Sequence, residues 1–213
     1  MREHKILHSE ISALTDSKDA LFRHAKSAVG RVFYISSWCE EDHPAIFSAF
    51  KIFQQLANDN YGKAYHPLSC LYRKSQDEKD EHQYQAQHIG QLAFEWSIAN
   101  QSNQDVEVWC DLGEMYICGY VVERDANQAA AWWRKAAEQG FVDAQWSLGV
   151  TYLDGNGVAK DITEAEKWIR LAAEQGNVHA QGTLGVMYIG GDGRSGLANS
   201  DSPLSGSLAQ PKP

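Results

Sequence analysis

The residue types in this chain that could bind a metal ion or form a disulfide are histidine and cysteine. His4 and His8 stand four positions apart, a spacing that puts two imidazoles on one face of a helix and supplies two corners of a metal site. Neither a third ligand nor a metalloprotease glutamate lies beside them, so we predict no metal site. The cysteines form no Cys-x-x-Cys pair and are expected to be reduced and packed as small apolar residues. They are Cys39, Cys70, Cys110 and Cys118.

The sequence favours neither a phosphate-binding loop nor a cofactor-binding motif. The glycine-rich stretch at 190–193 follows a helical pattern and no strand, whereas a phosphate-binding loop needs a strand before it. The pair Trp132-Trp133 is interpreted as one core residue and one residue packed on the next repeat. Most positions that recur along the chain carry apolar residues or glycine, so nothing favours a nucleophilic triad. We predict no enzyme activity and no cofactor.

The charge balance excludes whole classes of partner. With 19 Lys and Arg against 28 Asp and Glu, the formal net charge is -9, which repels a phosphate backbone and excludes nucleic acid as the expected partner. Charges near the N-terminus interrupt the apolar stretch that a secretory signal needs, and no apolar run is long enough to span a membrane. We therefore expect a cytoplasmic protein with no membrane partner, whose acidic surface favours a ligand with a basic segment.

An internal repeat is the strongest signal in the sequence. Residues 105–140 align without a gap with residues 141–176, and 15 of the 36 aligned pairs are identical. Both copies end in Ala-Ala-Glu-Gln-Gly, and a third copy begins at Asn177. Self-similarity at such a period is the signature of a solenoid built from stacked helix pairs. The identical pairs include Leu112/Leu148, Gly113/Gly149, Tyr116/Tyr152, Gly119/Gly155, Val122/Val158, Asp125/Asp161, Ala129/Ala165 and Trp132/Trp168.

The first helix of each repeat is predicted from its apolar spacing. Ala144, Leu148 and Tyr152 stand at i, i+4 and i+8, which forms one apolar stripe along a helix. A glycine interrupts this stripe although it lowers helix stability by about 1 kcal/mol relative to alanine. We infer that a neighbouring helix approaches too closely there for a Cβ atom. The glycine recurs in four copies, as Gly30, Gly113, Gly149 and Gly185.

The turn and the second helix of each repeat follow from glycine and aspartate positions. Gly155 and Gly157 are able to adopt positive φ and end the first helix. Asp161 is then predicted to cap the N-terminus of the second helix, as Asp125 does one repeat earlier. The second helix is expected to end at Gly176.

The recurring pattern resembles the Sel1-like repeat family, a subclass of tetratricopeptide-like α-solenoids. The residues that carry the resemblance read Ala-x-x-x-Leu-Gly-x-x-Tyr-x-x-Gly-x-Gly-Val-x-x-Asp, followed by Ala-x-x-Trp and Ala-Ala-Glu-x-Gly. The match is close over 105–193 and degenerate over 22–104. The resemblance implies helix pairs stacked into a right-handed superhelix, and a role as an adaptor in protein complexes, including those of bacteria.

We accordingly predict an all-α, right-handed α-solenoid of about four and a half helix-pair repeats in a single domain, residues 1–193. The segment 3–19 is expected to form an amphipathic helix that caps the N-terminal end of the stack. The segment 194–213 is rich in Gly, Ser and Pro without periodicity and is expected to be disordered. The predicted repeats are 22–60, 61–104, 105–140, 141–176 and the half repeat 177–193.

The resemblance also implies a binding surface on the first helices of the repeats. In a tetratricopeptide frame, the concave face of the solenoid is lined by positions that differ between copies, while the recurring positions hold the fold. Near the start these positions are basic and further on they are acidic, which predicts a dipolar groove for a peptide, with Trp146 as an aromatic anchor. Packing between repeats is the alternative for Trp146. The predicted partner-binding residues are Arg31, Tyr34, Lys63, His66, Glu107, Glu114, Asp143, Trp146 and Val150.

Three functions agree with these features to different degrees. The first is a non-enzymatic scaffold or adaptor that binds a polypeptide on its concave face, with self-association through a solenoid end as an added possibility. The second is an immunity or inhibitor protein that neutralises a toxin or effector enzyme. The third is β-lactam binding or hydrolysis, which cysteine-rich relatives suggest, but this chain lacks their regular cysteine pairing.

Overall fold

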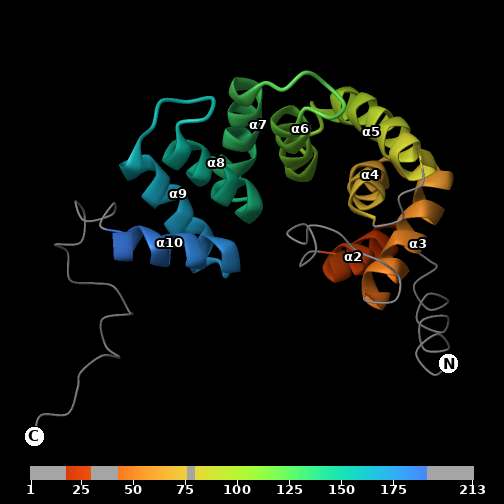
Figure 1. Cartoon of the computed structure of the whole chain (residues 1–213), viewed down its shortest axis with the longest axis horizontal. Helices are drawn as coiled ribbons and strands as arrows, with labels where there is room; N and C mark the ends of the chain where they lie inside the picture. The colour runs from red at the N-terminus through yellow and green to blue at the C-terminus, as the bar shows by residue number, and fades with distance from the viewer. Residues whose placement is uncertain (1–17, 30–42, 76–79, 191–213) are drawn as a thin grey trace, which may run out of the picture. The chain divides into compact units, whose positions relative to one another are not determined.

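Helices make up nearly all of the residues that the structure, a computed structural model, describes. These residues are 18–29, 43–75 and 80–190, and no strand occurs among them, which confirms the all-α prediction. None of the helices in these ranges is both long and apolar enough to cross a bilayer. The helices, shown in Figure 1, are α2 (Lys18–Val29), α3 (Pro44–Asn58), α4 (Tyr65–Lys74), α5 (Asp80–Asn100), α6 (Val106–Cys118), α7 (Ala126–Glu138), α8 (Val142–Asp154), α9 (Ile162–Glu174) and α10 (Val178–Gly190), with a 3-10 turn η1 (Gly62–Ala64) before α4.

Several sequence predictions fall outside the described residues. Most of the predicted N-terminal capping segment 3–19 and all of the predicted disordered segment 194–213 belong here. So do six single residues, which are His4, His8, Gly30, Arg31, Tyr34 and Cys39.

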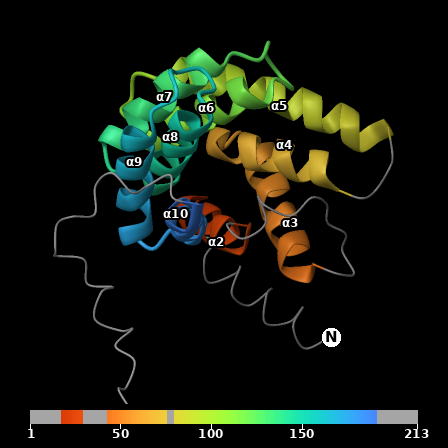
Figure 2. The same ribbon diagram turned by 60° about the vertical axis from the view of Figure 1, so that its left-hand side comes forward.

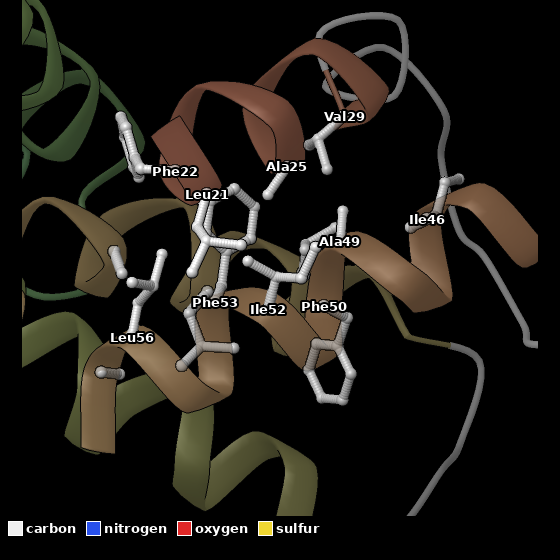
Figure 3. Close-up of a cluster of buried hydrophobic side chains, with 14 residues drawn as sticks. Leu21, Phe22, Ala25, Val29, Ile46, Ala49, Phe50, Ile52, Phe53 and Leu56 are labelled. Carbon is white, nitrogen blue, oxygen red and sulfur yellow. The ribbon is translucent and has the colours of Figure 1, made fainter. Parts of the chain in front are cut away.

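The helices form two compact units, one up to Asp125 and one from Ala126 onward. The core of the first unit begins where α2 packs on α3. The apolar residues of α3 recur at helical spacing, so they form one face toward α2. Phe22 of α2 and Phe53 of α3 meet edge-on with ring centroids 5.8 Å apart. Figure 3 shows these two faces, formed by Leu21, Phe22, Ala25 and Val29 of α2 and by Ile46, Ala49, Phe50, Ile52, Phe53 and Leu56 of α3.

The rest of the first unit adds α4, α5 and α6 to this core. Helix α4 packs along α5, as both views of the ribbon show. Leu68 and Leu71 of α4 are buried in the same core as α2 and α3, and Tyr72 contacts Phe50 edge-on at 4.9 Å between centroids. These contacts fix α4 between α3 and α5. The polar side chains at the start of α4 are thereby held in place.

The described part of the second unit, residues 126–190, consists of four helices, each packed on the next along the chain. Its core is formed by small residues and a few large ones, among them Ala165, Ile169, Ala172, Ala180 and Met187. Small side chains let the helices approach closely, which is why alanine dominates the recurring positions of the repeat.

The recurring mid-helix glycine has two different environments. A Cβ atom at Gly149 would lie 2.5 Å from Ile169 Cγ1 and 3.1 Å from the backbone nitrogen of Ile169, so α9 does approach as predicted. At Gly185 of α10, a Cβ atom would meet no atom within 4 Å. The prediction of a close neighbour is therefore wrong at Gly185, because no described helix packs on that side of α10.

The helix ends follow the predicted cap chemistry. Asp161 Oδ1 accepts hydrogen bonds from the backbone N–H groups of Thr163 (2.9 Å) and Glu164 (3.1 Å) at the start of α9. Gly119 and Gly155 follow α6 and α8 in the left-handed conformation, with φ of 67° and 73°. These caps confirm the predicted start of α9 and the predicted end of α8.

Candidate protein-binding surface

Four of the predicted binding residues come together in the first unit. Lys63 Nζ lies 2.6 Å from Asp105 Oδ2 and 3.9 Å from Glu107 Oε2. Lys26 Nζ of α2 donates to Glu107 Oε1 at 2.9 Å. His66 Nε2 lies 3.0 Å from Glu114 Oε2 and 3.9 Å from Asp111 Oδ1. We call this set the α2–α4–α6 charge cluster, which comprises Lys26, Lys63, His66, Asp105, Glu107, Asp111 and Glu114.

Two helical stripes position the cluster. On α6, Glu107, Asp111 and Glu114 stand at i, i+4 and i+7, so their carboxylates share one face. Across from them, Lys63 and His66 follow one another at i and i+3 through η1 and α4. An acidic stripe thus faces a basic one. The side chain of Asp105 also accepts a hydrogen bond from the backbone N–H of Glu107 and caps α6, which fixes where the acidic stripe begins.

His66 is the buried centre of the cluster, with 4% of its side chain exposed. Burial by itself lowers the pKa of the imidazole, but the surrounding groups, first Cys70 and then Asp111, outweigh it and hold the pKa well above 6.5. The hydroxyl of Tyr120 lies 3.5 Å from Nδ1, on the other side of the ring. The surrounding groups therefore favour the protonated, positively charged form of His66 beside the carboxylates.

Burial also alters the ionisation of the residues around His66. It raises the pKa of Asp111 to about 6, a rise limited by the positive charges of His66 and Lys26. For Lys26, burial lowers the pKa, but Asp111 and Glu107 outweigh it and raise the pKa above its ordinary value. The cluster is therefore charged on both sides at neutral pH. Its positive groups stabilise its negative ones across three helices.

Two groups approach the same nitrogen of the His66 ring. Cys70 Sγ lies 3.9 Å from His66 Nε2, and Glu114 Oε2 lies 3.0 Å from it. Within the described ranges, no three or more His, Cys, Asp and Glu side chains are placed to hold a metal ion.

The outer residues of the cluster reach solvent. The exposed fractions of the side chains are 31% for Lys63, 32% for Glu107 and 37% for Glu114. Such half-exposed ion pairs contribute little to folding, because water already solvates both charges well. They can instead be exchanged for charged groups of another chain, which makes the cluster a surface for electrostatic recognition.

The predicted binding residues in the second unit are Trp146, Asp143 and Val150. Trp146 of α8 is half-buried against the core of α9 and α10, and its indole N–H donates to Thr183 Oγ1 at 3.4 Å. Its ring also lies 5.5 Å from that of His179, between centroids. Trp146 therefore packs between repeats, which is the alternative to its role as an aromatic anchor. Asp143 is exposed and accepts a hydrogen bond from the side-chain amide of Asn177 at 3.1 Å, while Val150 is half-buried.

One prediction about the surface needs correction, and four residues were missed. The predicted separation of positive and negative charge does not occur in the first unit, because basic and acidic side chains are paired directly there. Lys26, Asp105, Asp111 and Tyr120 were not predicted. Asp111 could have been found, since it completes the acidic spacing on α6. No local signal joins Lys26 to Glu107, which lies 81 positions away along the chain.

The repeats match a known family model, and the chain is similar to solved structures. A Sel1 repeat model matches residues 110–141 and 142–177. The protective antigen c5321 of uropathogenic Escherichia coli, which displays an SLR fold, is 26% identical over 89% of this chain and 37% of its own, with a TM-score of 0.50. A Sel1 repeat protein from Oxalobacter formigenes is 36% identical over 52% of this chain and 45% of its own, with a TM-score of 0.47. Helicobacter pylori cysteine rich protein B is 22% identical over 63% of this chain and 96% of its own, with a TM-score of 0.46.

The chain spans less than half the length of the first two structures. A search of curated proteins gives no match. The family match and the helical architecture agree with the repeat found in the sequence, and they confirm the resemblance. Residues 110–177 match two Sel1 repeats, and the described residues of the chain form an all-helical fold.

Proposed function

We propose that this protein is a non-enzymatic scaffold that binds a polypeptide partner through the α2–α4–α6 charge cluster. Sel1 repeat proteins are in general protein-interaction scaffolds, and two such repeats are present here. The observation that carries the proposal is the convergence of seven charged side chains from α2, η1, α4 and α6 with its N-cap on one partly exposed surface.

The cluster favours a partner with a basic segment. It holds four carboxylates, of Asp105, Glu107, Asp111 and Glu114, against two lysines and the protonated His66. The whole chain also carries a formal net charge of -9, which accelerates encounters with a basic ligand. A lysine or arginine of the partner would compete with Lys63 for Glu107, or would bind the exposed oxygen of Glu114.

A reducing compartment, the cytoplasm, fits the described cysteines. Cys70 and Cys118 are free thiols, and Cys118 is exposed. Exposed thiols persist where glutathione and thioredoxin keep them reduced. We therefore place the scaffold in the cytoplasm as part of the proposal.

The test compares two doubly neutralised variants in affinity capture from a native extract. Glu107→Gln with Glu114→Gln removes two charges from the cluster while keeping hydrogen-bonding side chains. Glu138→Gln with Glu174→Gln removes the same charge from exposed positions of α7 and α9 in the other unit. The variants therefore share a net charge, and circular dichroism verifies that both stay folded. A partner that the control retains and the cluster variant loses supports the proposal.

Three other outcomes would change or contradict this proposal. A partner captured equally by both variants would place the binding surface outside the cluster. If the captured partner is an enzyme whose activity or toxicity falls on binding, and co-expression rescues cells from it, the protein is an inhibitor or immunity protein that uses the same surface. Hydrolysis of nitrocefin by the purified chain would contradict the non-enzymatic proposal.

A further inference from the structure

Helix α10 presents an apolar face that no described helix covers. Val178, Val186 and Ile189 are exposed by 69%, 70% and 90%. Gly182 and Gly185 lie between them, and a Cβ atom at either glycine would meet nothing within 4 Å. Exposure of this extent at one helix face is unusual for soluble proteins, because large apolar patches generally mark an interaction site.

The exposed face is a continuous stripe along α10, and the opposite side of this helix is buried in the core of the second unit. Val178, Gly182, Gly185 and Ile189 follow one another at steps of four, three and four residues, which places them in one row along a helix of about 16 Å from first to last. On the opposite side, Ala180 and Met187 are buried in the core of the second unit. The helix is therefore held in place while its outer row remains open.

The equivalent row of α8 shows what this kind of surface accepts. Gly185 corresponds to Gly149 in the repeat, and there Ile169 of α9 approaches so closely that a Cβ atom would clash. The glycine position in this repeat thus lets another helix approach closely. In α10 that position is vacant among the described residues.

We propose that a second copy of this chain occupies the face, with the two α10 helices packed antiparallel about a two-fold axis between residues 183 and 184. The row is symmetric about that point. Gly182 lies across from Gly185 of the second copy, and Val178 lies across from Ile189 of the second copy. The glycines let the helix backbones approach at the centre, and the larger side chains close the two ends. A surface that is complementary to itself in this way forms an isologous dimer.

The charge of α10 supports the same occupant. The helix contains no Asp, Glu, Lys or Arg over Val178–Gly190. Copies of a chain with a net charge of -9 repel one another, and an uncharged face is where two copies can approach at the lowest electrostatic cost. One helix face is smaller than a standard interface, so the dimer is expected to be reversible and to dissociate on dilution.

The test is sedimentation velocity of the full chain over a dilution series. The wild-type chain should pass from dimer to monomer on dilution, and Gly185→Glu should weaken the dimer by roughly tenfold or more, because it places like charges beside the two-fold axis. The added side chain meets open space in the monomer and replaces a helix-breaking residue, so the variant keeps its fold, which circular dichroism checks. Ala131→Glu, at an exposed position of α7, adds the same charge elsewhere and should dimerise as the wild type does.

Two results would overturn the proposal. The first is a wild-type chain that remains monomeric at every concentration, which would leave the face to a helix of another protein. The second is a dimer that Gly185→Glu and Ala131→Glu leave equally intact, which would place the contact on a different surface.

Discussion

Replacing the repeat's mid-helix glycine with alanine should have opposite effects on stability at two equivalent positions. At Gly149, the new Cβ would lie 2.5 Å from Ile169 Cγ1, 3.1 Å from Ile169 N and 3.2 Å from Ala165 O. Two of these three atoms belong to the backbone of α9, so relief requires the whole helix to shift. At Gly185, the new Cβ would meet no atom within 4 Å.

The magnitudes follow from two competing effects. Overpacking a close helix contact lowers the free energy of unfolding by about 1–3 kcal/mol. Replacing glycine with alanine inside a helix raises it by about 0.5–1 kcal/mol. We expect Gly149→Ala to lose about 1–2 kcal/mol net, and Gly185→Ala to gain about 0.5–1 kcal/mol. The two variants should differ by roughly 2 kcal/mol although the substitution is the same.

The assay is urea unfolding followed by far-ultraviolet circular dichroism, at a concentration at which the chain sediments as a monomer. With a slope of about 1–3 kcal/mol per molar urea, the two midpoints should separate by roughly 1 M. Combining Gly149→Ala with Ile169→Ala removes the clashing atom, so the double variant should lose less than the sum of the single losses. A Gly149→Ala chain as stable as wild type, or additive losses, would refute the close packing of α8 and α9.

Three further predictions concern the caps, the cluster and the tryptophan. Asp161→Ala should lower the free energy of unfolding by about 0.5–2 kcal/mol in the same assay, because two backbone N–H groups of α9 lose their acceptor; an unchanged midpoint would contradict the cap. The raised pKa of His66 stabilises the fold fully below the unfolded pKa of about 6.5, and this contribution is lost as pH rises through the folded pKa. The difference in unfolding free energy between wild type and His66→Gln should therefore shrink as pH increases above 6.5, and a difference that grows instead would show that the imidazole is buried neutral. Trp146→Ala should cost about 2 kcal/mol, because the half-buried ring packs on α9 and α10; a stable variant with impaired binding would return Trp146 to the binding surface.

The repeat in the second half of the chain could be predicted in detail because its recurring residues specify structure directly. Leu148, Gly149 and Ala165 hold helices together at short range, and Asp161 and Gly155 mark where helices begin and end. Each of these roles depends on residue type and spacing within one repeat, which are visible in a sequence. The predicted extension of the repeat scheme over residues 22–104 stays a prediction.

The surface could be predicted only in part, because its chemistry depends on distances between helices. Spacing placed Lys63 and His66 on one face and Glu107 and Glu114 on another, but it did not show that the two faces meet. Trp146 fits a binding position and a packing position equally well by spacing, and contact with the next repeat decides between them. Likewise, whether Gly185 has a close neighbour depends on which helix packs beside it. The glycine alone does not reveal this.

Photo-crosslinking tests most directly whether a polypeptide binds at the α2–α4–α6 charge cluster. A photo-reactive residue in place of Glu114 samples the exposed edge of the cluster, and the same residue in place of Glu138 samples an exposed position of the other unit. After irradiation in native extract, we expect a discrete protein adduct at position 114 that excess salt diminishes, and none at position 138. Adducts at position 138 alone, or no salt-sensitive adduct at position 114, would contradict this expectation.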